Sequence, residues 1–197
     1  MKTPQYIELE GRSPRFFALM AILLVIIGAG VISALIMHGQ GHIITGMTNR
    51  IVWGTPHVFA VFLIVAASGA LNVASMASVF GRKIYKPLSP LSMVMSFAIL
   101  AGGLLILILD LGRPEHLLDV PLTQFLYNSM PSRWSRSVFG WNFILYTVFM
   151  AAVIVYLWFS LVKRYNKYAK YAGLFAFVWR LALTTGTGLI FGFLVAR

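Results

Sequence analysis

The chain has 197 residues, of which 59% are hydrophobic and 11% are charged. Soluble globular domains carry about twice that share of charged residues, so an ordinary soluble domain is excluded. The sequence contains no cysteine. Thiolate-ligated iron–sulfur clusters, c-type haem attachment and disulfides are therefore excluded within it.

Apolar runs of about 20 residues recur along the sequence, and this is the length that a helix needs to cross a bilayer core. Backbone groups in lipid must be paired within their own segment, which favours helices. The sequence therefore predicts an all-α membrane protein, with residues 1–197 forming a single polytopic membrane domain. The five expected spans are residues 16–37, 56–80, 91–109, 138–162 and 172–196.

The net charge of +11 is distributed by loop and does not form a patch typical of nucleic-acid binding. Ten of the 16 Lys and Arg residues precede the first span or lie in the second and fourth loops. The positive-inside rule then predicts a cytoplasmic N-terminus, with the third loop outside. Membrane lipid, including anionic headgroups, is the expected partner of these charges, and no nucleic acid is expected.

The end of the third span carries the most informative polar residues, in the segment Leu-Asp-Leu-Gly-Arg-Pro-Glu-His over residues 109–116. An ionisable side chain at a membrane boundary is costly unless it has a partner or a function. Because adjacent spans are antiparallel, Asp110 should lie at the same end as His57, which begins the second span. An imidazole beside a carboxylate can exchange protons, as a quinone-binding site requires. The alternative is that Asp110 pairs with Arg113 and caps a turn.

Small and polar residues line one face of the second and third spans. Helical periodicity groups them as His57, Ser68, Asn72 and Ser75, and as Ser92, Ser96, Gly103 and Asp110. Such lines are typical of helix-packing seams, and this is the preferred interpretation for the serines. For Asn72, packing and function are equally favoured.

Three further side-chain interpretations remain open. Arg180 lies inside the fifth span, where it is expected to snorkel to the inner interface or, less favoured, to line a polar channel. A buried bis-His haem is disfavoured because all four histidines lie at or beyond the outer boundary. No tight cluster of His and carboxylates indicates zinc.

Five motifs taken together resemble the NrfD/PsrC family of quinone-interacting membrane subunits, and its DsrP/HmcC-like branch most closely. They are Trp53-Gly-Thr-Pro-His57, Ser68-Gly-Ala-Leu-Asn72, Leu109-Asp110-Leu-Gly-Arg113-Pro, Phe139-Gly-Trp141-Asn142 and Thr184-Thr-Gly-Thr-Gly188. The resemblance covers nearly all of this chain but only the N-terminal half of a family member. A C-terminal half or a second membrane subunit is therefore expected as a partner.

The resemblance implies that four of the helices form one bundle of an NrfD-like fold. It also implies a membrane subunit of a respiratory-type oxidoreductase complex in the prokaryotic cytoplasmic membrane. Menaquinone or ubiquinone would be an exchangeable substrate, and the chain would hold no haem or iron–sulfur cluster of its own. Electrons would pass between the quinone and an extracytoplasmic iron–sulfur protein, with cytochrome or catalytic subunits beyond it. The nearest branch suggests a sulfur-compound pathway.

The resemblance also assigns residues to quinone binding and proton exchange. His57 and Asp110 would be the principal ones, with Asn72 and Arg113 as supporting groups. Ser68 stands where some branches have a histidine. No metal ligand and no residue of covalent catalysis is assigned, and whether the chain is itself an enzyme stays open.

Two alternative functions are kept. The chain could be a structural membrane anchor for such a complex, with no quinone site of its own. It could also be half of a small transporter, in which case helix breaks would be expected at Gly28-Ala29-Gly30 and Gly186-Thr187-Gly188.

Overall fold

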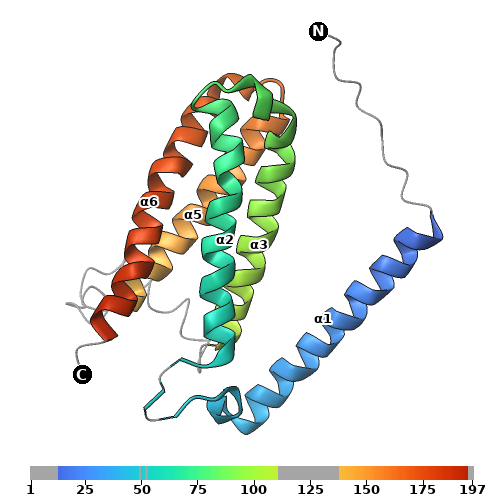
Figure 1. Ribbon diagram of the computed structural model, residues 1–197, viewed down its shortest axis with the longest axis vertical. Coiled ribbons are helices and arrows are strands. Elements are labelled where there is room, and N and C mark those ends of the chain that lie inside the picture. The colour runs from blue at the N-terminus through green and yellow to red at the C-terminus, as the bar shows by residue number, and fades with distance from the viewer. Residues whose placement is uncertain (1–12, 49, 52, 111–137, 195–197) are drawn as a thin grey trace, which may run out of the picture.

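The computed structural model describes residues 13–48, 50–51, 53–110 and 138–194, and Figure 1 shows how their helices are arranged. Within these described residues, five helices are long and apolar enough to cross a membrane, as the sequence predicts. They are α1 (Pro14–Gln40), α2 (Thr55–Ser78), α3 (Ser89–Asp110), α5 (Val138–Leu161) and α6 (Ala169–Leu194). Each boundary lies within three residues of the expected one.

Helices α2, α3, α5 and α6 form one bundle, which confirms the expectation of a four-helix bundle. Helix α2 packs on α3 and α6, and α5 packs on the same two helices, so the contacts close into a ring (Figure 1). Two short 3-10 helices, η2 (Lys83–Leu88) and η3 (Asn166–Tyr168), make the tight connections of two antiparallel pairs. The largest fully buried side chains are Tyr156, Phe149, Ile64, Leu71, Met93, Leu100 and Leu183.

The seam between α2 and α3 is built from small residues, which lets the two backbones approach closely. Ser96 Oγ donates a hydrogen bond to the carbonyl oxygen of Ala67 at 2.8 Å, and Ser92 Oγ donates to that of Ala70. Gly103 lies so close to α2 that an added Cβ would be 3.1 Å from Leu63 Cβ. The preferred interpretation of these serines as packing residues is therefore confirmed.

A buried tyrosine joins α5 to α2. The hydroxyl of Tyr156 donates to the carbonyl oxygen of Ala74 at 3.0 Å and is hydrogen-bonded to Ser78. Gly173 on α6 packs against the same ring, since a Cβ there would be 3.0 Å from Tyr156 Cζ. Three helices thus meet at one point near the η2 and η3 connections.

Helix α1 stands apart from the bundle in Figure 1. Ser13 is its N-cap, and Ser13 Oγ accepts a hydrogen bond from the backbone N–H of Phe16 at 3.2 Å. Pro14 at the first helical position favours the first turn. It ends at Gly41, whose φ of 81° is readily adopted only by glycine. Met37 is its one buried residue. Helices α1 and α6 both run without interruption through the glycine pairs at 28–30 and 186–188, so neither expected transporter break is present.

The two ends of the bundle differ in chemistry. One end carries η2 and η3 with most of the described basic side chains, and we call it the basic end. The other end carries the start of α2 and the end of α3, and we call it the His57 end. Which end faces the cytoplasm stays a prediction of the positive-inside rule.

Candidate functional site

His57 and Asp110 are in direct contact at the His57 end. His57 lies in the first turn of α2, which follows Gly54 and includes Pro56, and Asp110 is the last residue of α3. The imidazole Nδ1 lies 3.0 Å from Asp110 Oδ2, and each side chain is only 8% exposed. The antiparallel order of α2 and α3 therefore brings together the two residues that the sequence suggested. Their quinone-binding role stays a prediction.

The contact orients the imidazole. When Asp110 is ionised it can only accept hydrogen bonds, and the Nδ1–H of His57 is then the donor to Asp110 Oδ2. The basic nitrogen of the neutral ring is then Nε2. The Trp53 ring packs on the imidazole with ring centroids 3.8 Å apart. The pair thus combines a buried carboxyl group with an imidazole whose tautomer and ring plane are both restrained.

His42 joins this pair, and sequence reasoning missed it as a site residue. It begins the 3-10 helix η1 (His42–Thr45), and its Nδ1 lies 3.9 Å from Asp110 Oδ1. Its side chain is 27% exposed. Among the residues that the structure describes, neither His42 Nδ1 nor Asp110 Oδ1 has a hydrogen-bond partner. Helical periodicity could not place His42 because it lies in a loop, whose path the period of a helix does not predict.

The loop that carries His42 is folded back on the start of α2. Thr45 Oγ1 donates to the carbonyl oxygen of His42 at 2.7 Å, and Thr55 Oγ1 donates to that of Thr45 at 3.3 Å. Gly54 packs so closely on Thr45 that a Cβ at residue 54 would clash with its hydroxyl. Gly46 adopts a φ of 84°, which closes the turn after η1. These contacts hold His42 beside Asp110.

The other expected site residues are not at this pair. Ser68 and Asn72 follow His57 by 11 and 15 residues on the same helix, which is about 16 and 22 Å along α2 at 1.5 Å per residue. They lie on the same face of α2 as His57 but at a different position along the helix axis. Arg113 lies outside the described residues.

Asn72 is instead bonded to Arg180. The guanidinium of Arg180 donates to Asn72 Oδ1 and lies 4.8 Å from the centroid of the Phe177 ring. One terminal nitrogen of Arg180 is thus bonded to a side chain of α2, and the expectation that Arg180 snorkels to the interface stays a prediction. The carbonyl oxygen of an amide offers a cation a strong acceptor without a second charge.

Polar residues on α5 link it to α6. Asn142 Nδ2 donates to the carbonyl oxygen of Gly186 at 3.1 Å. The Tyr146 hydroxyl and Thr187 Oγ1 are 3.2 Å apart. These bonds join helices in a way that is common in membranes, so these side chains serve packing between α5 and α6.

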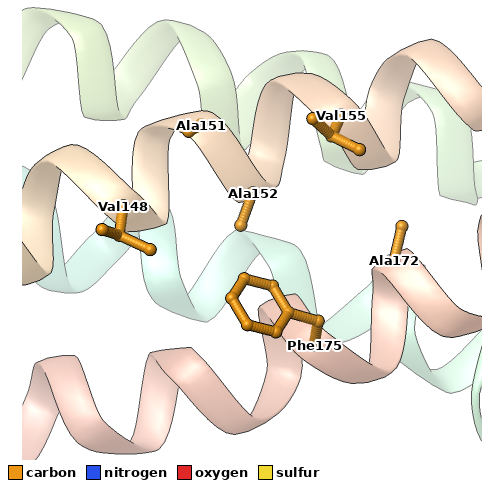
Figure 2. Close-up of a pocket in the computed structure, with 6 residues that line it drawn as sticks. All are labelled: Val148, Ala151, Ala152, Val155, Ala172 and Phe175. Carbon is orange, nitrogen blue, oxygen red and sulfur yellow. The ribbon is translucent and has the colours of Figure 1, made fainter.

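An apolar groove lies on the surface between α5 and α6, as Figure 2 shows. Its volume is about 190 Å³, and it is lined by Val148, Ala151, Ala152, Val155, Ala172 and Phe175. A second groove continues it past Phe159, Tyr168 and Tyr171, toward the basic end. The first groove is suited to hydrocarbon, but the described side chains that line it carry no polar group that could bind a quinone head group. It is therefore separate in chemistry and in position from the His57–Asp110 pair.

The fold and this pair define a class: a multi-pass helical membrane protein with a buried histidine–aspartate contact at one end of a four-helix bundle. The family described as "Polysulphide reductase, NrfD" matches residues 44–197. This is most of the sequence, and the chain belongs to the NrfD family. The matched region includes α2, α3, α5 and α6, and it leaves out α1 and His42.

Two relatives extend the comparison. The Hdr-like menaquinol oxidoreductase integral membrane subunit of Archaeoglobus fulgidus is 28% identical over 193 residues, which is 98% of this chain and 46% of that protein. A selenate reductase subunit of Mesobacillus selenatarsenatis is 24% identical over 155 residues, which is 79% of this chain and 34% of that protein. The chain thus spans less than half the length of these curated relatives. No solved structure matches the chain significantly.

Proposed function

We propose that this chain is the quinone-interacting membrane part of an oxidoreductase complex. The observation that carries the proposal is the contact between His57 and Asp110, which join at 3.0 Å while each is 8% exposed. Both residues lie in the region that the NrfD family matches. Membership of that family and the name of the menaquinol oxidoreductase relative support the quinone as substrate.

The chemistry that the pair would support is proton transfer coupled to quinone redox change. A quinol that becomes a quinone releases two protons and two electrons. In the proposal, His57 and Asp110 take the protons from the hydroxyl groups, and an iron–sulfur protein of the complex takes the electrons one at a time. The reverse sequence would reduce a quinone. The residues of this chain bind, orient and exchange protons, while the quinone and the partner's cluster carry the electrons.

The partner is proposed to dock at the His57 end, on the extracytoplasmic side that the charge distribution predicts. Electron transfer favours a short path, so the cluster and the quinone head group belong at the same end of the bundle. Cytochrome or catalytic subunits would lie beyond this protein, as part of a complex of the kind after which both relatives are named. Arg113, three residues after Asp110 in the chain, is kept as a supporting residue in this proposal.

The experiment that tests the proposal compares Asp110→Asn and His57→Gln with the unchanged protein in membranes that contain the assembled complex. Oxidation of menadiol by an artificial dye is measured. We expect kcat/KM to fall by about 10²-fold or more in each variant, which is the usual contribution of a positioned proton-transfer group. The matched control is His38→Gln, since His38 is an exposed residue in the last turn of α1.

Unchanged menadiol oxidation in both variants, with normal assembly, would contradict the proposal. That outcome would favour the structural-anchor alternative, in which the chain holds the complex in the membrane and takes no part in quinone chemistry.

A further inference from the structure

We infer that His42 is the group through which the buried His57–Asp110 pair exchanges protons with external water. The inference rests on the proposed function, because it concerns the route of the protons that a quinol would release. It adds His42 to the site, and His42 lies two positions before the region matched by the NrfD family.

Asp110 lies between two imidazoles. His57 Nδ1 approaches Oδ2 at 3.0 Å, and His42 Nδ1 approaches Oδ1 at 3.9 Å. The carboxyl group therefore has one oxygen directed to each ring. Because the two imidazoles lie on different oxygens, a proton received at the oxygen beside His57 reaches His42 when the carboxyl group rotates about its Cβ–Cγ bond.

The side chains of the three residues differ in their exposure to solvent. His57 and Asp110 are each 8% exposed, whereas His42 is 27% exposed. A proton held by the buried pair needs a route to water, and His42 is the most exposed member of the cluster. Imidazole suits this position because one ring nitrogen can accept a proton while the other gives one up.

His42 Nδ1 and Asp110 Oδ1 both lack a hydrogen-bond partner among the described residues, although both atoms are buried. A buried polar atom without a partner is costly, and a catalytic role is one of the accepted explanations for such an atom. Their separation of 3.9 Å is too long for a hydrogen bond. A side-chain rotation of His42 that shortens it by about 1 Å would make the bond.

The proton balance of the route is simple. Asp110, protonated at Oδ1, gives its proton to His42 Nδ1 and becomes a carboxylate again. The His42 imidazolium then loses a proton from Nε2 to water, which leaves the neutral Nδ1–H tautomer. Exchange of protons with water at both ring nitrogens restores the Nε2–H tautomer, whose Nδ1 can accept again. One proton enters and one leaves, and no electron moves through these side chains.

The test uses His42→Gln in membranes with the assembled complex, again with menadiol as the electron donor. We expect kcat to fall by about 10²-fold while KM stays unchanged, because the quinol still binds at the intact pair. The solvent deuterium isotope effect on kcat should increase, since proton release becomes rate-limiting. Millimolar imidazole in the buffer should restore turnover. A second variant, His42→Asn, gives the same readouts if His42→Gln fails to assemble, and His38→Gln is the matched control.

The outcomes separate this inference from the proposed function. A loss of turnover that imidazole does not restore would mean that His42 acts only through structure, and it would overturn the inference. Normal turnover in His42→Gln, with activity lost in Asp110→Asn, would also overturn it and leave the proposed function standing. Normal turnover in Asp110→Asn as well would reject both.

Discussion

The guanidinium of Arg180 on α6 donates a hydrogen bond to Oδ1 of Asn72 on α2, so a partly buried cation is bonded between two helices of the bundle. Arg180 lies 11 residues after the start of α6, or about 17 Å from it along the axis. Its side chain passes over Phe177, whose ring makes an edge contact with Phe80 at a centroid distance of 5.4 Å. The contact links the first and the last helix of the bundle.

This contact predicts that Asn72→Leu destabilises the protein. The variant removes the acceptor and leaves the charge of Arg180 in an apolar setting, at a cost of about 2 kcal/mol, typical of hydrogen bonds to charged groups. Unfolding of the detergent-solubilised protein by heat or denaturant measures the effect. The double variant Asn72→Leu/Arg180→Leu should recover part of the loss, because no unpaired charge remains. Simple addition of the two single effects would show that the pair is not coupled.

The close approach of α3 to α2 at Gly103 predicts that Gly103→Leu is strongly destabilising. A Cβ at this position would already be 3.1 Å from Leu63 Cβ and 3.3 Å from the carbonyl oxygen of Ala60. The larger side chain must push the helices apart, and such overpacking costs about 1–3 kcal/mol. The control is Gly102→Leu, because an added Cβ at residue 102 would meet no heavy atom within 4 Å. Equal melting temperatures for the two variants would argue against the observed α2–α3 distance.

The hydroxyl of Tyr156 predicts a smaller and more local effect. Tyr156→Phe keeps the buried ring but loses the hydrogen bonds to the Ala74 carbonyl and to Ser78. We expect a loss of about 1 kcal/mol in the free energy of unfolding, as for other hydrogen bonds between membrane helices. Tyr171→Phe serves as the control because Tyr171 is 70% exposed. A wild-type denaturation curve for Tyr156→Phe would show that the ring alone joins α5 to α2.

The contact between Gly54 and Thr45 predicts that Gly54→Ala impairs proton exchange without removing a titratable group. The new methyl group would displace Thr45, and with it the η1 loop that places His42 beside Asp110. We expect menadiol oxidation to fall in the same direction as in His42→Gln, again with rescue by imidazole. Gly39→Ala is the control, since an added Cβ there would meet nothing within 4 Å. Full activity in Gly54→Ala would mean that the position of η1 does not matter for turnover.

Much of the fold could be predicted from the sequence because apolar runs and helix length are local properties. All five helices can be located in this way, with boundaries within three residues of those observed. The short connections between α2 and α3 and between α5 and α6 make antiparallel pairing the natural expectation. That pairing alone is enough to bring His57 and Asp110 to one end.

Residue partners between distant segments could not be predicted in the same way. Periodicity places Asn72 on the same face of α2 as His57. Two residues on one face can still lie far apart along the helix axis, and Asn72 lies about 22 Å from His57 in that direction. Its partner Arg180 is 108 residues away in the chain. The Asn72 amide and the Arg180 guanidinium meet only because α6 packs against α2.

By itself, the sequence determined that this protein is a helical membrane protein of the NrfD family, since hydropathy and motif spacing are properties of local stretches of the sequence. Only the tertiary structure decided that His42 joins Asp110, that Arg180 bonds to Asn72, and that α1 stands apart from the other helices. The physical reason is that packing between helices and the path of a loop depend on contacts between segments far apart in the chain. The periodicity of a local stretch of sequence does not predict such contacts.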